Sequence, residues 1–163
     1  MSKKNYKRLL SSYFSTYFPE VLFFTILFAF SFWLMFHTFN YHDGNMLIGG
    51  KAWSDFSSHI PLIRSFSFGY NFPPQYPLFP GEPIHYHFVF YFVVGMLEKI
   101  GLPINYALNI PSALGFFALV LAIYLFAYYL FRSRIVSFLS VVFFLFNGSL
   151  SFLIFFQKHP LSS

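Results

Sequence analysis

Side chains capable of acid–base or metal chemistry gather in one interval of this chain, residues 53–87, and in its immediate flanks. The flanked interval carries most of the histidines and three of the five acidic residues, Asp43, Asp55 and Glu82. A carboxylate in such a setting serves as a general base toward a hydroxyl group or as a ligand for a hard cation. On both sides the sequence is dominated by Phe, Leu, Ile, Val and Tyr, so we expect the chemistry of the protein in this interval.

Asp55 is the best candidate for a catalytic residue. It lies near the start of a helix predicted near residues 52–68, where the helix dipole stabilises a carboxylate. His59 follows one turn later on the same helix face, and Arg64, nine residues on, suits a phosphate at a lipid surface. Simpler interpretations stay open. Asp55 would then be a helix N-cap, His59 would be hydrogen-bonded to the backbone, and Arg64 would reach ordinary lipid phosphates.

A second group of candidates follows a proline-rich stretch, residues 69–83. His85 and His87 are two residues apart, so they share a face only in an extended segment, not in a helix. With Glu82 and Asp55 nearby, a divalent-metal site is an open alternative, although no recognised metal spacing is present. Tyr86, between the two histidines, is an interfacial anchor or a ring on which a sugar stacks.

The absences narrow the chemistry further. The chain has no cysteine, which excludes disulfides, zinc–thiolate sites and thiol catalysis. Glycine-rich phosphate loops and nucleotide-binding fingerprints are also missing. Any activated donor must therefore be activated as a lipid.

The composition is that of a membrane protein. Of the 163 residues, 57% are hydrophobic and only 9% are charged, whereas soluble domains carry about 25% charged residues. So few charges cannot cover a folded surface, and lipid must cover much of it. The net charge of +5 does not indicate nucleic acid, because the first eight residues hold four of the ten basic side chains.

We expect an all-α membrane protein with about three transmembrane helices, at residues 19–38, 105–131 and 135–156. Pro19 suits the first turn of the first span. Residues 39–104 form an outer loop with interfacial helices near 52–68 and 84–100. The basic N-terminus stays in the cytoplasm, and Arg132 and Arg134 return to that side. A cleaved signal peptide at the first span, and a fourth span at 84–100, are the alternatives.

The order of these parts resembles the N-terminal part of GT-C superfamily glycosyltransferases, multi-pass enzymes that use lipid-phosphosugar donors. The resemblance covers about residues 20–156 and is carried by a pattern rather than a strict motif. Its elements are Asp55, Arg64, Gly69, Pro83-Ile-His-Tyr86, Gly101-Leu-Pro-Ile, and Ala113-Leu-Gly through Phe131-Arg132-Ser-Arg134.

The resemblance implies transfer of a sugar from a polyprenyl-phosphate donor to an acceptor at the outer membrane face. It places the role of catalytic base or metal-coordinating acid on Asp55. The donor or metal site would then be lined by Arg64, His59, His85, His87 and Tyr86.

The chain also departs from the family pattern. The family often pairs two acids where this chain has Asp55-Phe56, and a Tyr where it has His59. Family members are several hundred residues long, so we expect an N-terminal fragment that would be inactive alone, a truncated gene product or a degenerate relative. The alternative function is a non-enzymatic small integral membrane protein.

Overall fold

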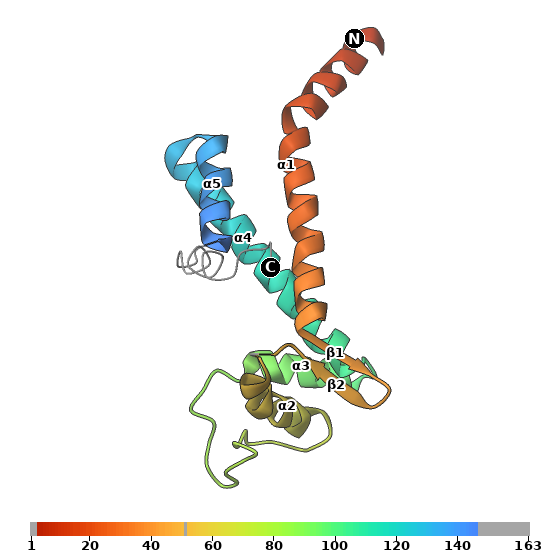
Figure 1. Cartoon of the computed structure of the whole chain (residues 1–163), viewed down its shortest axis with the longest axis vertical. Coiled ribbons are helices and arrows are strands. Elements are labelled where there is room, and N and C mark those ends of the chain that lie inside the picture. Colours follow the sequence, from red (N-terminus) through yellow and green to blue (C-terminus); the bar gives the residue numbers. More distant parts are fainter. Residues whose placement is uncertain (1–2, 51, 147–163) are drawn as a thin grey trace, which may run out of the picture. The chain divides into compact units, whose positions relative to one another are not determined.

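The computed structural model describes residues 3–50 and 52–146. The chain divides into two compact units, Met1–Phe117 and Ala118–Ser163, with the boundary inside the helix α4. Along the chain (Figure 1) lie α1 (Lys3–Thr38), β1 (Phe39–His42), β2 (Asn45–Ile48), α2 (Trp53–Ser67), α3 (Val89–Lys99), α4 (Ile104–Phe131) and α5 (Arg134–Leu145). The predicted helical character is confirmed, but the small sheet contradicts the all-α prediction.

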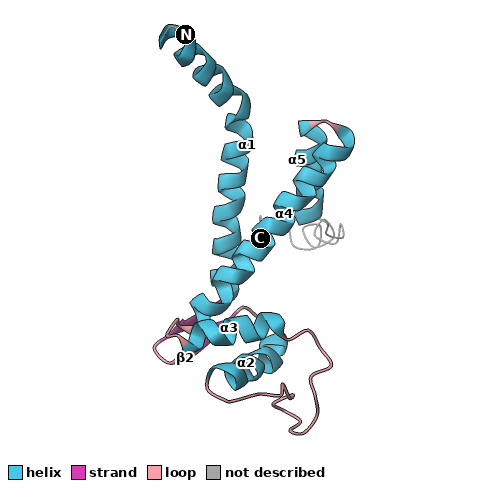
Figure 2. Cartoon of the chain, turned by 180° about the vertical axis from the view of Figure 1, so that it is seen from behind, coloured by secondary structure: helices cyan, strands magenta, loops and turns pink. Residues whose placement is uncertain are grey.

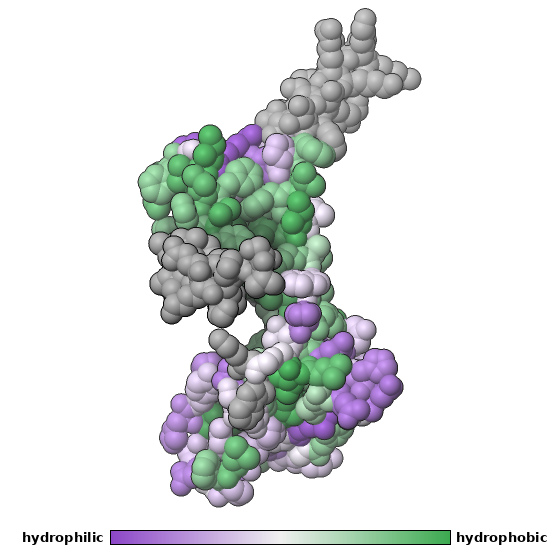
Figure 3. Space-filling view, viewed as in Figure 1, coloured by the Kyte–Doolittle hydropathy of each residue, from purple (hydrophilic) through white to green (hydrophobic). Residues whose placement is uncertain are grey.

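Two helices have the length and composition of membrane spans. These are Tyr17–Thr38, with 22 residues, and Ile104–Phe131, with 28, and a bilayer core of roughly 30 Å needs about 20 residues. Only 11% and 17% of their most apolar stretches are buried within the protein, whereas a core helix of a soluble protein is mostly buried. Figure 3 shows hydrophobic residues gathered over these helices and more hydrophilic residues over the hairpin and the loop after α2.

The first helix begins earlier than its sequence predicted. Pro19 lies inside α1, about four turns after Lys3, rather than in a first turn. A proline in a helix interior removes one N–H donor and favours a bend. Figure 1 shows α1 changing direction in its N-terminal part.

A β-hairpin follows α1 without a break. Phe39 pairs with Ile48 and His42 with Asn45 in antiparallel register. The turn uses Asp43 (φ 50°) and Gly44 (φ 80°), the left-handed pair that two-residue hairpin loops require. The two four-residue strands around this turn were not predicted from the sequence.

The hydrophobic core lies where α2 packs on α3. Ile60, Ile63 and Phe66 of α2 are buried, and Phe56 packs against the same cluster, which confirms the apolar face expected from their helical spacing. The helices approach closely at Gly95, where an added Cβ would lie 2.8 Å from the Ile63 carbonyl oxygen. This face of α2 is therefore covered by protein.

Two buried asparagines tie the hairpin to α4. Asn109 donates its Nδ2 to the Phe39 carbonyl oxygen at 2.7 Å, and Asn105 donates its Nδ2 to Asn40 Oδ1 at 2.8 Å. Both asparagines are almost fully buried. The C-terminal end of α1 is thus fixed to the first turns of α4 by hydrogen bonds.

The segment before α3 is not helical, which corrects the expected helix start at residue 84. Gln75 forms an isolated antiparallel bridge with Pro83, and the Ile84 amide donates to the Pro74 carbonyl at 3.4 Å. This pairing keeps residues 83–87 out of the helix, and Figure 2 shows the long loop that joins α2 to α3. His85, Tyr86 and His87 therefore lie in a connecting segment.

The second unit contains the end of α4 and α5. Tyr124 contacts Phe138 edge to face at 5.3 Å, and Ser137 and Val141 are buried. Ser133 caps α5 by accepting from the Val136 amide. Of the span predicted at 135–156, residues 147–156 lie outside the described part of the chain, as does the C-terminal tail.

Candidate functional site

Asp55 and His59 lie one turn apart in the N-terminal half of α2. The N-cap is Ala52 and makes no side-chain cap, so Asp55 is a first-turn residue rather than the cap. Its side chain is exposed, whereas His59 is half-buried. The carboxylate remains open to a substrate at the positive end of the helix dipole.

The histidine is surrounded by groups from α3 and the segment before it. The rings of His59 and Tyr91 lie 4.9 Å apart between centroids. Burial is the main cause that lowers the pKa of His59 below 6.5, the nearby His87 lowers it further, and Asp55 partly opposes them. His59 is therefore neutral at pH 7, when an imidazole can accept a proton.

Tyr91, which was not among the predicted site residues, belongs to the same group. Burial, the proximity of Tyr86, a hydrogen bond with the Tyr86 side chain and the charge of Asp55 all raise the pKa of Tyr91 above 10.0. Tyr86 in turn stacks against His87 at 3.7 Å. The polar cluster thus consists of Asp55, His59, Tyr86, His87 and Tyr91.

The cluster borders a cavity of about 360 Å³, here called the tyrosine cavity. Its lining is rich in hydroxyl groups and contains Ser58, His59, Leu62, Tyr76, Tyr86 and Tyr91. A second, more apolar cavity of about 250 Å³, the junction cavity, lies where α1, α2, α3 and α4 meet. His59 and Tyr91 line both cavities, so this pair of rings lies between the polar tyrosine cavity and the more apolar junction cavity.

Arg64 is not part of the cluster. It lies about 13 Å further along the α2 axis than Asp55, and its Nε is 3.5 Å from Glu98 Oε1. That distance is long for a hydrogen bond, so the contact is an ion pair. Ser67 donates to the other oxygen of Glu98 at 2.7 Å, and Arg64 also lies over the Phe68 ring.

The remaining predicted residues are exposed. Glu82 and His85 lie on the connecting segment with their side chains open to solvent. Among the described residues, no three histidine or acidic side chains converge in a way that would hold a metal ion. The structure therefore brings four of the predicted site residues together and leaves Arg64 and His85 outside.

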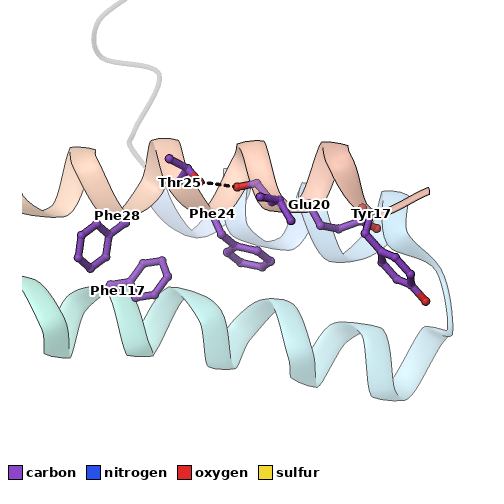
Figure 4. Close-up of a pocket in the computed structure, with 7 residues that line it drawn as sticks. Tyr17, Glu20, Phe24, Thr25, Phe28 and Phe117 are labelled. Carbon is purple, nitrogen blue, oxygen red and sulfur yellow. Dashed lines mark hydrogen bonds between the residues drawn. The ribbon is translucent and has the colours of Figure 1, made fainter. Parts of the chain in front are cut away.

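A larger groove of about 470 Å³ runs between α1 and the part of α4 in the same unit (Figure 4). Phe28 and Phe24 pack edge to face on Phe117, at 5.3 and 6.4 Å. Tyr17 and Glu20 lie toward one end. Its lining is mostly hydrocarbon and lacks a cluster of acid–base groups, so we place the candidate site at the tyrosine cavity instead.

Sequence periodicity alone did not reveal Tyr91 and Tyr76 as site residues. Tyr91 follows His87 by four residues, but α3 begins only at Val89, so this spacing carries no helical relation. Tyr76 reaches the cavity because residues 75 and 83 pair across the loop.

No family model, curated protein sequence or solved structure matches this chain.

Proposed function

We propose that this protein transfers a sugar from a polyprenyl-phosphate donor to a hydroxyl acceptor at the outer membrane face, in the manner of GT-C glycosyltransferases. The observation that carries the proposal is the gathering of Asp55, His59, Tyr86, His87 and Tyr91 beside a cavity, in the segment between two apolar helices. These residues come from α2, from the connecting segment and from α3, and together they supply a base and two tyrosine hydroxyls.

In this proposal Asp55 is the general base. It accepts the proton of the acceptor hydroxyl as the acceptor oxygen attacks the anomeric carbon of the sugar. The bond between that carbon and the phosphate oxygen breaks, and polyprenyl phosphate leaves with the electron pair. The atoms and electrons of this step balance without a metal ion.

Neutral His59 and the hydroxyl groups of Tyr86 and Tyr91 orient the sugar in the tyrosine cavity. His87 replaces Arg64 in the expected contact with the leaving phosphate, because Arg64 is engaged by Glu98. A lipid donor suits the location, since the adjoining junction cavity is largely apolar. It offers space for the first part of an isoprenoid chain.

The proposed topology has three spans, a cytoplasmic N-terminus and the hairpin, α2 and α3 outside. It is supported by the length of α3, whose 11 residues rise about 17 Å and cannot cross a bilayer core. Val89 and Val93 give α3 an exposed apolar face suited to the interface. A cysteine placed at Ser133 should react with a membrane-impermeant maleimide only from the cytoplasmic side; reaction only from outside would refute this topology.

The function is tested by reconstituting the chain in proteoliposomes with a panel of polyprenyl-phosphate hexoses and measuring release of polyprenyl phosphate. We expect turnover of at least one donor, and a loss of about 100-fold or more for Asp55→Asn. The matched control is Asp43→Asn, in the exposed hairpin turn where Asp43 pairs with His42, and it should retain full turnover.

Turnover that survives Asp55→Asn would remove Asp55 from the mechanism. An absence of turnover with every donor would favour the non-enzymatic alternative. Asp55→Asn should stay folded and lose no more than about 1 kcal/mol in the free energy of unfolding, from the helix dipole, because the exposed carboxylate has no side-chain partner among the residues that the structure describes.

A further inference from the structure

The loop between α2 and α3 contains another cavity, to which the proposed reaction assigns no ligand. This loop cavity has a volume of about 250 Å³ and lies beside residues 69–80. Tyr70 and Tyr76 provide aromatic walls, and Asn71 and Gln75 provide amides. Tyr76 also lines the tyrosine cavity, so the two spaces share a wall.

The cavity is held in shape by side-chain hydrogen bonds within the loop. Asn71 donates through Nδ2 to Ser65 Oγ at 2.9 Å and to the Gln75 carbonyl at 2.8 Å, and its Oδ1 accepts from the Gln75 amide at 2.8 Å. Gln75 Oε1 accepts from the Gly81 amide at 3.1 Å. Such bonds fix the walls before a ligand arrives, which lowers the entropic cost of binding.

The two aromatic walls differ in exposure, because Tyr70 is open to solvent and Tyr76 is half-buried. Tyr70 is 93% exposed, and Lys99 covers only one face of its ring, at 5.1 Å from the centroid. Tyr76 stacks on Phe79 at 5.8 Å, which holds its ring in place. An exposed ring with one supported face offers its other face to a flat apolar surface.

The chemistry of the lining selects among ligands. The residues that line the cavity include no acidic or basic side chain that could pair with a charged ligand. Lys99, beside the cavity on the Tyr70 ring, disfavours a basic peptide. Aromatic faces next to amide and hydroxyl groups match a neutral sugar, which has apolar C–H faces and a rim of hydroxyls. In the described part of the chain, Gln75 Nε2 makes no protein hydrogen bond and is available as a donor.

We infer that the loop cavity binds a neutral saccharide and that this saccharide is the acceptor of the transfer. The acceptor assignment rests on the proposed function, whereas the binding itself does not. The shared wall at Tyr76 would place an acceptor hydroxyl toward the tyrosine cavity, where the donor sugar is held. The acceptor is thus a glycan rather than a peptide or a lipid.

The test uses the full chain in detergent micelles, titrated with neutral tetrasaccharides of glucose, mannose, galactose and N-acetylglucosamine, and followed by saturation-transfer difference NMR. Tetragalacturonate serves as the anionic counterpart. We expect saturable binding of at least one neutral tetrasaccharide and weaker binding of tetragalacturonate. Failure of all four neutral ligands, or equal binding of the anion, would overturn the inference.

Substitutions locate the site. Tyr70→Ala should weaken binding about tenfold through the lost stacking, and Tyr70→Phe should stay within about threefold because it keeps the ring. The matched control is Leu78→Ala, exposed in the same loop but outside the cavity lining, and it should bind normally. Equal losses in Tyr70→Ala and Leu78→Ala would assign the loop to a lipid surface instead, and unchanged binding in Tyr70→Ala would also refute the site.

One further variant separates this inference from the proposed function. Asp55→Asn should keep saccharide binding within about threefold, since Asp55 does not line the loop cavity and would contact only the reacting hydroxyl. Retained turnover in Asp55→Asn with Tyr70-dependent binding would refute the proposed catalytic base and leave the saccharide site standing. Loss of turnover without any saccharide binding would do the reverse.

Discussion

The two ends of α2 differ in whether the charged side chain there has a partner within the protein. At the C-terminal end, Glu98 is only 7% exposed and holds Arg64 and Ser67. At the N-terminal end, Asp55 is exposed and acts on His59 and Tyr91 without a described side-chain hydrogen bond. A charged side chain that is bound by protein partners stabilises the packing of two helices. A carboxylate beside a cavity that has no such partner is available for chemistry.

The difference also separates two residues that the sequence analysis placed in one site. There Asp55 was expected as the catalytic base or a metal-coordinating acid, and Arg64 as part of the lining of the donor site. The structure separates them, since Glu98, 34 positions after Arg64 in sequence, engages the guanidinium. Variants that unbalance either end of α2 test this comparison.

The largest stability effect is expected at the helix crossing next to the Arg64 end. Gly95→Ala places a Cβ 2.8 Å from the Ile63 carbonyl oxygen and 2.9 Å from Phe66 Cβ, so α2 and α3 must move apart. We expect a loss of about 1–3 kcal/mol in the free energy of unfolding, measured by denaturant unfolding in micelles.

Gly115→Ala is the matched control for this substitution, because an added Cβ at that position in α4 meets no atom within 4 Å. It should leave stability unchanged or raise it by up to about 1 kcal/mol, since alanine favours helix more than glycine does. Equal behaviour of the two variants would show that the crossing at Gly95 is looser than described.

A smaller loss is expected when the buried acid is neutralised. Glu98→Gln keeps the shape and an acceptor for Ser67 but leaves Arg64 without its counter-charge. Because the Arg64 side chain is 38% exposed and solvent screens it, we expect a loss of only about 1–2 kcal/mol. Glu82→Gln, on the exposed loop, should change the same unfolding measurement little, and a comparable loss there would contradict the structural role of Glu98.

At the Asp55 end, Tyr91→Phe tests the hydroxyl that bonds to Tyr86. Removing it should cost about 1 kcal/mol of stability and should lower donor turnover, while Tyr124→Phe, in the second unit, serves as the control for turnover. Unchanged turnover in Tyr91→Phe would exclude the hydroxyl from sugar orientation. The assay is the release of polyprenyl phosphate described above.

The smallest effect concerns pH. The pKa of His59 is lowered in the folded chain, so the unfolded chain takes up the proton first as pH falls below 6.5. Its contribution therefore leaves stability unchanged above this range and reduces it progressively below. The unsubstituted chain should lose more stability than His59→Gln between pH 7.5 and 5.5; an equal loss would mean that the His59 ring is solvated.

Local patterns predicted the local parts of the fold. The spans at residues 19–38 and 105–131 follow from apolar length, and the apolar face of α2 follows from helical spacing. The hairpin was missed because two four-residue strands are too short for an alternating pattern to stand out. The start of α3 was misplaced because residues 84–88 contain no proline or glycine that would exclude a helix, and only the pairing of Gln75 with Pro83 keeps them out of it.

The candidate site could also be predicted only where local spacing relates its residues. Asp55 and His59 were predicted together because one helical turn relates them. Tyr91 and Tyr76 join them through packing between segments distant in sequence, which no spacing reports. The pair of Arg64 with Glu98 is equally non-local, and its effect was to remove a predicted residue from the site rather than to add one.

The asparagine bonds between the hairpin and α4 have a consequence for how the protein sits in a bilayer. Asn109 and Asn105 hold the end of α1 and the first turns of α4 at one level. Neither span can then slide along its axis by itself in response to a thicker or thinner membrane. Both adjust as a pair, by tilting or by deforming the lipid, so the depth of the tyrosine cavity relative to the membrane surface is set once for both helices.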